Sequence, residues 1–123
     1  MTLESREYGK EAEKFAESYL QKNGYDILEI NYKTRYGEID LVAREGKTLV
    51  FIEVKARRSS AFGGPSGALN LTKKKKLSRM ASYYLSEKRW TGDVRFDVVL
   101  ITGEVQDCSA ALVRNAFDAE SGW

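Results

Sequence analysis

The charged residues Glu53 and Lys55 directly follow an apolar run, residues 49–52, in the middle of the chain. In a β-strand alternate side chains share one face, so these two ions are expected side by side at the end of an otherwise buried strand. Burying both ions costs several kcal/mol unless other groups compensate. The pair is therefore a candidate for chemistry.

A further carboxylate, Asp40, lies in the preceding segment, which is expected to pair with this strand. The two-residue period places Glu38 on the face of Asp40, and a hairpin brings Asp40 beside Glu53. Two close carboxylates raise each other's pKa, and a divalent cation between them removes the conflict. We therefore expect Asp40 and Glu53 to bind a metal ion, to which the Val54 carbonyl could add an oxygen. The metal could polarise a phosphoryl oxygen and activate water, while Lys55 orients that water or stabilises negative charge.

The chain contains no histidine. This excludes Ser-His-Asp and Cys-His nucleophile systems, histidine-ligated zinc and histidine general bases. Carboxylate oxygens are hard ligands that suit Mg²⁺ or Mn²⁺, so the available residue types favour metal-assisted work on phosphates. The single cysteine, Cys108, cannot form an internal disulfide, which suits a reducing compartment.

Positive charge is concentrated in the middle of the chain. Residues 33–79 contain twelve Lys and Arg against four Asp and Glu, although the whole chain has a net charge of only +2. Such asymmetry favours a polyanionic partner, and a solvated lysine face is the alternative. No apolar stretch approaches the roughly 20 residues of a membrane span, so we expect a cytoplasmic protein with no membrane partner.

The elements that must position these residues follow from hydrophobic periodicity and turn signals. With 123 residues, 42% of them hydrophobic, one α/β domain over 1–123 is expected. The predicted order is helix, three strands, helix, strand: a helix over 7–22, strands over 25–30, 37–43 and 48–56, a loop over 58–68, a helix from residue 70 or 72 to 88, and a strand over 93–102. The second and third strands form an antiparallel hairpin. The run 49–52 is apolar on both faces, as in a central strand covered by helices on both sides.

The spacing Asp-x12-Glu-x-Lys is easily met by chance, so another interpretation stays open. Glu53 and Lys55 could form an ion pair on one strand face, with Asp40 facing water at a strand end. Arg95 and Asp97 also share a strand face, and there we expect a structural pair without a catalytic role.

Motifs along nearly the whole chain favour the metal site over the ion pair as the interpretation of Asp40, Glu53 and Lys55. They are Ala16-x-x-Tyr19-Leu20 with Gly24-Tyr25, Asn31, Tyr36-Gly37-Glu38-Ile39-Asp40-Leu41-Val42-Ala43, Phe51-Ile52-Glu53-Val54-Lys55-Ala56-Arg57, Phe62-Gly63-x-Pro65, Lys73, Arg95-Phe96-Asp97-Val98-Val99 and Asn115-Ala116-Phe117. With these motifs the sequence resembles the YraN-like family of predicted bacterial endonucleases. That family lies within the PD-(D/E)xK, or restriction-endonuclease-like, superfamily, which includes archaeal Holliday-junction resolvases.

The resemblance implies a restriction-endonuclease-like fold, with a central mixed β-sheet flanked by helices. It implies Asp40 and Glu53 as metal ligands and Lys55 as the catalytic lysine. It also maps the acidic residue of the family's first helix onto Glu13, which would hold a second metal or a metal-bound water; an exposed helix glutamate is the alternative. Ala12 stands where the family pattern has glycine, and Ile39 stands where the superfamily name has proline.

Four basic residues are the candidates for nucleic-acid binding: Arg35, Arg57, Arg58 and Lys73. Arg57 shares a strand face with Glu53 and Lys55 and could hold a phosphate bidentately. Lys73 lies along the buried stripe of the second helix, whereas the lysines that follow it point to solvent. For Tyr36 a packing role at the sheet edge is weighed against stacking on a base.

The function that the sequence favours is a Mg²⁺- or Mn²⁺-dependent endonuclease acting on nucleic acid, with branched or otherwise non-standard DNA as the expected substrate. A nucleic-acid-binding module without activity and a protein-interaction module are the alternatives. By analogy with resolvase-like relatives, a homodimer is expected.

Overall fold

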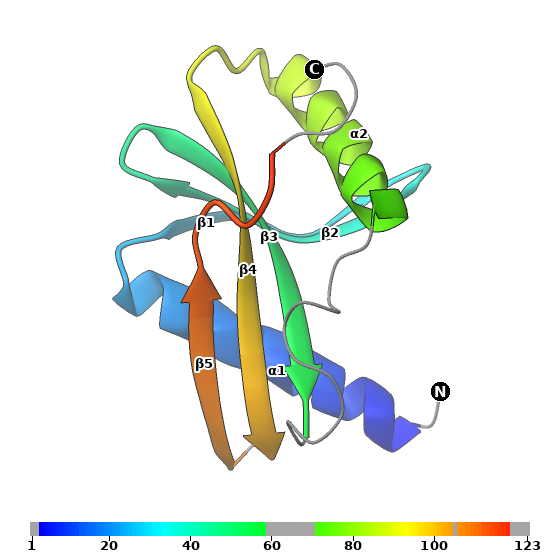
Figure 1. Cartoon of the computed structure of the whole chain (residues 1–123), viewed down its shortest axis with the longest axis vertical. Helices are drawn as coiled ribbons and strands as arrows, with labels where there is room; N and C mark the ends of the chain where they lie inside the picture. The colour runs from blue at the N-terminus through cyan, green and yellow to red at the C-terminus, as the bar shows by residue number, and fades with distance from the viewer. Residues whose placement is uncertain (1–2, 59–70, 105, 119–123) are drawn as a thin grey trace.

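The computed structural model describes residues 3–58, 71–104 and 106–118. Its elements are α1 (Leu3–Lys22), β1 (Asp26–Thr34), β2 (Gly37–Glu45), β3 (Thr48–Arg57), α2 (Leu71–Lys88), β4 (Asp93–Glu104) and β5 (Asp107–Val113). The strands form one sheet in the order β1-β2-β3-β4-β5, in which β3 and β4 are parallel and the other neighbours antiparallel. The predicted central mixed sheet with flanking helices is confirmed, as is the β2–β3 hairpin. In Figure 1, α1 passes behind β3, β4 and β5, and α2 lies at the other end of the sheet.

The strand β5 is not among the predicted elements, which end with the strand over 93–102. It pairs with β4 from Val98↔Val113 to Glu104↔Asp107. Its alternation is weak in the sequence, since only one of its three partly buried inward residues, Leu112, is a large aliphatic residue, and the others are Cys108 and Ala110. The turn before it needs glycine: Gly103 has a φ of +113°, and a Cβ there would lie 2.6 Å from a backbone oxygen. The predicted loop over 58–68 lies outside the described residues from 59 onward.

The sheet is buried on both faces, as the apolar run 49–52 predicts. Val50 and Ile52 belong to the core cluster on the α1 face, and Leu49 and Phe51 belong to the cluster on the α2 face. The α1 cluster comprises Ala12, Ala16, Leu20, Tyr25, Leu41, Ala43, Val50, Ile52, Val99 and Ile101. The α2 cluster comprises Ile39, Val42, Leu49, Phe51, Leu77, Met80, Ala81, Tyr84, Phe96 and Phe117. Odd residues of β3, including Glu53, therefore face α2.

Helical spacing fixes how each helix meets the sheet. On α1 the buried residues Ala12, Ala16 and Leu20 recur every four positions, and the two alanines are small enough for the helix to lie close to the strands. On α2 the residues Leu77, Met80, Ala81 and Tyr84 are buried against the sheet, and Leu85 beside them is partly buried. No helix in the described part of the chain is long and apolar enough to cross a membrane.

The strand β2 leaves its neighbour β3 at Asp40. Pairing of β2 with β3 runs from Glu45↔Thr48 to Leu41↔Ile52, whereas pairing with β1 continues to Gly37. Ile39 and Leu41 would share a face in a regular strand, but they lie in clusters on opposite faces of the sheet, so the chain rotates between them. We call this divergence of residues 37–40 of β2 from residues 53–54 of β3 the fork. It opens a space at the centre of the sheet for polar side chains.

A buried polar network closes the opposite end of β2. The guanidinium of Arg95 donates to both carboxylate oxygens of Asp97 at 2.9 Å and to Glu45 Oε1 at 2.6 Å. Tyr25 Oη donates to Asp97 Oδ2 at 2.7 Å, and the backbone N–H of Asn115 donates to Asp97 Oδ1 at 2.9 Å. The expected Arg95–Asp97 pair is thus present, and it ties the start of β4 to the segment after β5.

Candidate metal centre

Asp40 stands where the ladder between β2 and β3 stops. Its Oδ2 accepts a hydrogen bond of 2.8 Å from the backbone N–H of Val54, replacing the strand bond that β2 no longer supplies. The N–H and carbonyl of one strand residue point to the same side of the strand, so the Val54 carbonyl also faces the fork. This is the orientation that the predicted role of Val54 as an oxygen ligand requires.

Three carboxylates meet at the fork, one from α1 and two from β2. Glu13 of α1 and Glu38 and Asp40 of β2 each offer one oxygen, and these oxygens all lie within 4.8 Å of one another. An octahedral ion with ligands at about 2.1 Å has ligand oxygens roughly 3 to 4 Å apart, so a small closing movement satisfies it. The donor set is all oxygen and anionic, which fits a hard divalent cation. We call Glu13, Glu38 and Asp40 the acidic cluster.

Asn31 of β1 supports this cluster and was not predicted as a site residue. With its amide nitrogen facing the carboxylates, it donates to Glu13 Oε2 at 3.1 Å and to Glu38 Oε1 at 2.9 Å. Its φ is +51°, a left-handed conformation that asparagine tolerates better than most residues. The pairing of β1 with β2 skips this position, passing from Ile30↔Leu41 to Tyr32↔Ile39. The motif that carries Asn31 was visible in the sequence, but its positive φ and its two carboxylate partners were not.

The electrostatics of the cluster show an excess of negative charge. Burial first, and then the charge of the nearby Glu53, raise the pKa of Asp40 to about 7, against the lowering effect of the Val54 hydrogen bond. The pKa of Glu13 is also raised, by burial first and then by Glu38. A bound cation would reverse both shifts, because it favours the charged form of each carboxyl group.

Glu53 lies on the α2 side of the fork and is only 8% exposed. Its Oε1 forms an ion pair with Lys73 Nζ of α2 at 2.7 Å. It is not one of the three residues of the acidic cluster, yet its charge is close enough to raise the pKa of both Asp40 and Glu13. The structure therefore brings Glu53 next to the predicted ligand Asp40, with a lysine ammonium in place as its partner.

Lys55 follows Glu53 on the same face of β3, as its spacing predicts. Burial lowers its pKa, and the ammonium of Lys73, which is close enough to hydrogen-bond with it, lowers it further. Conversely, the hydrogen bond to Glu53 and the charge of Glu53 raise the pKa of Lys73 above its ordinary value, although burial opposes this. Two amines and one carboxylate thus form a compact group beside the acidic cluster.

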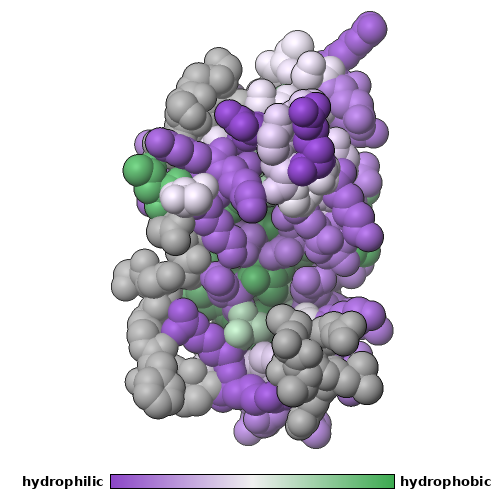
Figure 2. Space-filling view, turned by 90° about the vertical axis from the view of Figure 1, so that its right-hand side faces the viewer, coloured by the Kyte–Doolittle hydropathy of each residue, from purple (hydrophilic) through white to green (hydrophobic). Residues whose placement is uncertain are grey.

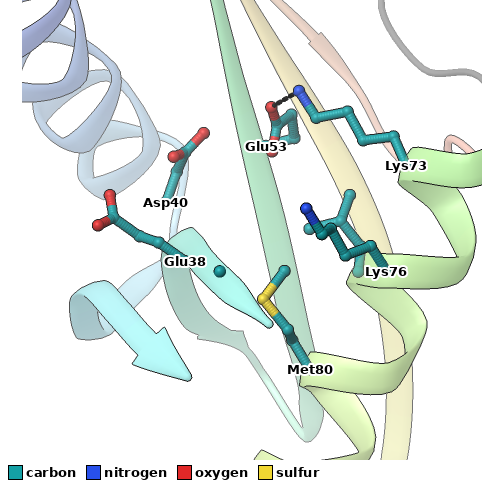
Figure 3. A pocket seen from close by; sticks show the side chains of 8 residues that line it. Glu38, Asp40, Glu53, Lys73, Lys76 and Met80 are labelled. Atoms are coloured by element: carbon teal, nitrogen blue, oxygen red, sulfur yellow. Dashed lines mark ion pairs between the residues drawn. The ribbon is translucent and has the colours of Figure 1, made fainter. Parts of the chain in front are cut away.

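A pocket of about 250 Å³ lies between the fork and α2. It is lined by Gly37, Glu38, Asp40, Glu53, Lys73, Lys76, Leu77 and Met80. Figure 3 shows Glu38 and Asp40 on one side of it, with Lys73 and Lys76 reaching from α2 on the other, and the dashed line marks the pair of Lys73 with Glu53. A small anionic group entering this pocket would meet carboxylates, which need a cation, and ammonium groups, which attract it directly.

The remaining basic candidates are spread around the site. Arg57 is partly buried and follows Lys55 on the α2 face of β3. Arg35 is exposed in the turn between β1 and β2, with its guanidinium 5.4 Å from the centre of the Tyr36 ring. Arg58 points to the other face of the sheet, where it lies 4.5 Å over the ring of Tyr8 and 3.5 Å from Glu104. Its placement gives no support to its predicted role beside Arg57.

The fold and the site define an α/β protein whose mixed sheet divides around a candidate metal centre of carboxylates. The chain belongs to the uncharacterised protein family UPF0102, whose profile matches residues 12–101 and so spans Glu13, Asp40, Glu53 and Lys55. A UPF0102 protein of Desulfosudis oleivorans is 43% identical over 120 residues, covering 97% of this chain and 96% of the relative. A UPF0102 protein of Syntrophus aciditrophicus is 43% identical, covering 93% of this chain and 91% of the relative. Another, from Thermodesulfovibrio yellowstonii, is 46% identical, covering 90% of this chain and 96% of the relative. Membership of the YraN-like family, UPF0102, which the sequence motifs suggested, is thereby confirmed.

Proposed function

We propose that this protein is a metal-dependent endonuclease that hydrolyses phosphodiester bonds in nucleic acid. The observation that carries the proposal is a pocket lined by Glu38 and Asp40 of the acidic cluster, by the buried Glu53 and by the two lysines Lys73 and Lys76 of α2. Carboxylates that hold a divalent cation, beside ammonium groups that hold a phosphate, are the parts that phosphodiester hydrolysis requires. The resemblance to PD-(D/E)xK nucleases, which assigns Asp40, Glu53 and Lys55 these same roles, supports it independently.

The residues present fit Mg²⁺ or Mn²⁺ better than zinc, because every donor is an oxygen. Glu13, Glu38 and Asp40 would hold the ion, and Glu53 and the Val54 carbonyl lie on the opposite wall of the same fork. When bound, the ion would supply Lewis-acid activation of the phosphoryl group. Asn31 holds two of the carboxylates in place by donating to both of them.

Two lysines would act on the substrate, Lys73 from the lining of the pocket and Lys55 from its position two residues after Glu53 on the same face of β3. Lys55 lies next to Glu53 and offers its ammonium to a non-bridging phosphoryl oxygen, where it stabilises the negative charge that develops during hydrolysis. Lys73 neutralises Glu53 in the free protein and can turn to a phosphate when one enters. Each lysine therefore makes an interaction that a neutral side chain cannot replace.

DNA is the proposed nucleic acid, in branched or otherwise non-standard form, as in the resolvases that the sequence resembles. Lys73 lines the pocket, Arg57 follows Lys55 on the same face of β3, and Arg35 lies in the turn between β1 and β2. These three residues would hold the phosphate backbone. Figure 2 shows mainly hydrophilic side chains on the side of the molecule where α2 and the β1–β2 turn lie, around a small apolar area at its centre. A second copy of the chain would place a second site on a symmetric substrate, so we include a homodimer in the proposal by analogy.

A cleavage panel tests this function. Linear, flapped and four-way-junction DNA are incubated with Mg²⁺ or Mn²⁺, using the wild type and the variants Asp40→Asn, Glu53→Gln and Lys55→Ala. We expect metal-dependent cleavage by the wild type and a loss of at least about a hundredfold in each variant. Glu11→Gln is the matched control, because Glu11 is an exposed α1 carboxylate paired with Lys14, and it should cleave like the wild type.

Three outcomes would overturn the proposal. Cleavage that persists in all three purified variants would come from a contaminant or from another site. Salt-sensitive DNA binding without cleavage of any substrate would instead identify a binding module on a nuclease-like scaffold. Absence of both DNA binding and cleavage would favour a protein-interaction module.

A further inference from the structure

Four side chains next to the pocket form a cationic and aromatic group that is separate from the acidic cluster. The ring of Tyr36 lies 5.7 Å from that of Tyr83, between centroids. The guanidinium of Arg79 lies 5.0 Å from the centre of the Tyr36 ring, and that of Arg35 lies 5.4 Å from it. We call Arg35, Tyr36, Arg79 and Tyr83 the stacking surface.

The turn between β1 and β2 presents this surface in a fixed position. Thr34 Oγ1 accepts a hydrogen bond of 3.1 Å from the backbone N–H of Tyr36 and donates one of 3.0 Å to the carbonyl of Gly37. Tyr36 also packs against the core cluster on the α2 face. The turn is therefore held at both ends, so its residues need little ordering when they bind a ligand.

The stacking surface continues directly from the pocket. Gly37, which lines the pocket, follows Tyr36 in the chain, and on α2 the spacing of Lys76, Arg79 and Tyr83 places them along one side of the helix. Lys76 lines the pocket as well. A strand whose phosphate lies at the acidic cluster would therefore reach the stacking surface within its next few nucleotides.

Packing alone does not account for the composition of this surface. Tyr83 is 44% exposed, an unusual degree for a ring that serves only as core. Within the described residues neither Arg35 nor Arg79 has a carboxylate partner, and both guanidinium groups lie against a tyrosine ring instead. One exposed ring and one partly buried ring beside guanidinium groups without carboxylate partners match what an unpaired base and its phosphate require.

We propose that the stacking surface binds an unpaired nucleotide that flanks the cleaved bond, so that the preferred substrate is DNA in which a duplex gives way to a single strand. This inference rests on the proposed nuclease function and specifies its substrate class. The base stacks on the exposed ring of Tyr83 and on the guanidinium planes held by Tyr36. Arg79 and Arg35 bind the adjoining phosphates. A fully paired end has no free base to offer, so it gains only the phosphate contacts.

Binding is measured without cleavage, in protein that carries Asp40→Asn, so that the test does not depend on turnover. One DNA is a blunt duplex, and the other is the same duplex with a single-stranded flank that contains 2-aminopurine next to the junction. Fluorescence reports both affinity and stacking of that base. Tyr83→Ala is the main variant because Tyr83 is exposed, and Tyr83→Phe keeps the ring. Arg79→Ala and Tyr36→Ala test the neighbouring groups, and Arg44→Ala, at the other end of β2, is the matched charge control.

We expect Tyr83→Ala to weaken binding of the flanked duplex about tenfold and to abolish quenching of 2-aminopurine, with at most about a twofold effect on the blunt duplex. Tyr83→Phe and Arg44→Ala should bind both DNAs like the parent. Equal losses on both DNAs, or no loss on either, would overturn the inference. Absence of cleavage by the wild type, with flank-selective binding intact, would instead refute the nuclease function and leave this surface as a binding site.

Discussion

Lys73 Nζ of α2 lies 2.7 Å from Glu53 Oε1 of β3, and this pair joins the helix to the wall of the fork. The glutamate is only 8% exposed, so without a cation its charge would be costly. The lysine thus occupies the electrostatic position that a metal ion or the Lys55 ammonium could also fill. In the metal-free protein, Lys73 therefore offsets the free-energy cost of burying the charge of Glu53.

Replacing Lys73 by methionine, which keeps the length of the side chain, should lower the free energy of unfolding of the metal-free protein by about 1 to 2 kcal/mol. Breaking a fully buried pair costs about 3 to 5 kcal/mol, and the 37% exposure of the Lys73 side chain reduces the effect. Mn²⁺ should restore more stability to this variant than to the wild type. Urea denaturation with EDTA or Mn²⁺ measures both effects, with the exposed Lys75→Met as control. Equal stability of Lys73→Met and the wild type in EDTA would show that the pair is not needed.

Asp40 makes the stability of the metal-free protein fall as pH rises. Below about pH 4 its carboxyl group is protonated in both the folded and the unfolded chain, so there it causes no change of stability with pH. Between pH 4 and 7 the unfolded chain loses this proton while the folded chain keeps it, because the folded pKa is about 7 against an ordinary value of 3.8. The free energy of unfolding therefore falls over this range, by at most about 4 kcal/mol.

Asp40→Asn should remove this dependence, since asparagine keeps an oxygen for the Val54 N–H and carries no charge. We expect the variant to be more stable than the wild type at pH 7.5 in EDTA and to differ little from it at pH 4. Thermal denaturation of both proteins at several pH values measures the difference. A wild type that equals or exceeds the variant in stability at pH 7.5 would contradict the raised pKa.

Asn31→Gly should weaken Mn²⁺ binding by about tenfold without strain in the backbone. Glycine readily adopts the φ of +51° found here, so the substitution removes only the amide that donates to Glu13 and Glu38. Loss of a residue that orients metal ligands typically costs 10- to 100-fold in affinity. Calorimetric titration gives the affinity, and unchanged Mn²⁺ binding would mean that the amide does not position the ligands.

Asp97→Asn should separate structural from functional carboxylates. Asp97 is 1% exposed and accepts hydrogen bonds from Arg95, Tyr25 and the backbone of Asn115. Removing its charge leaves a partly buried guanidinium less well paired, and we expect a loss of about 3 kcal/mol in the free energy of unfolding. The folded variant should bind Mn²⁺ like the wild type. Loss of metal binding by the folded variant would extend the functional site to this network.

Local patterns in the sequence were enough to predict much of the fold and part of the site. The two-residue period placed Glu53 and Lys55 on one face of β3, and helical spacing placed Lys73 on the side of α2 that meets them. Their ion pair and neighbouring amines follow from these periods. The same period could have shown that Arg58, one residue after Arg57, faces the other side of the sheet.

The missed features depend on where strands separate, which local patterns do not encode. Asn31 meets Glu13 and Glu38 only because β1 takes a left-handed residue opposite the fork. The divergence of β2 from β3 turns Asp40 out of the regular ladder, so that its carboxylate joins those of Glu13 and Glu38. β5 went unrecognised because two of its three inward residues, Cys108 and Ala110, are small, and all three are only partly buried.

The metal centre itself is tested most directly by calorimetric titration of Mn²⁺ into the wild type and Asp40→Asn at pH 8, with and without DNA. At this pH the wild-type Asp40 is ionised, given its pKa of about 7. We predict saturable Mn²⁺ uptake by the wild type and by Glu11→Gln, and its loss in Asp40→Asn. No uptake by the wild type under either condition, or the same uptake by Asp40→Asn, would contradict a metal centre at the fork.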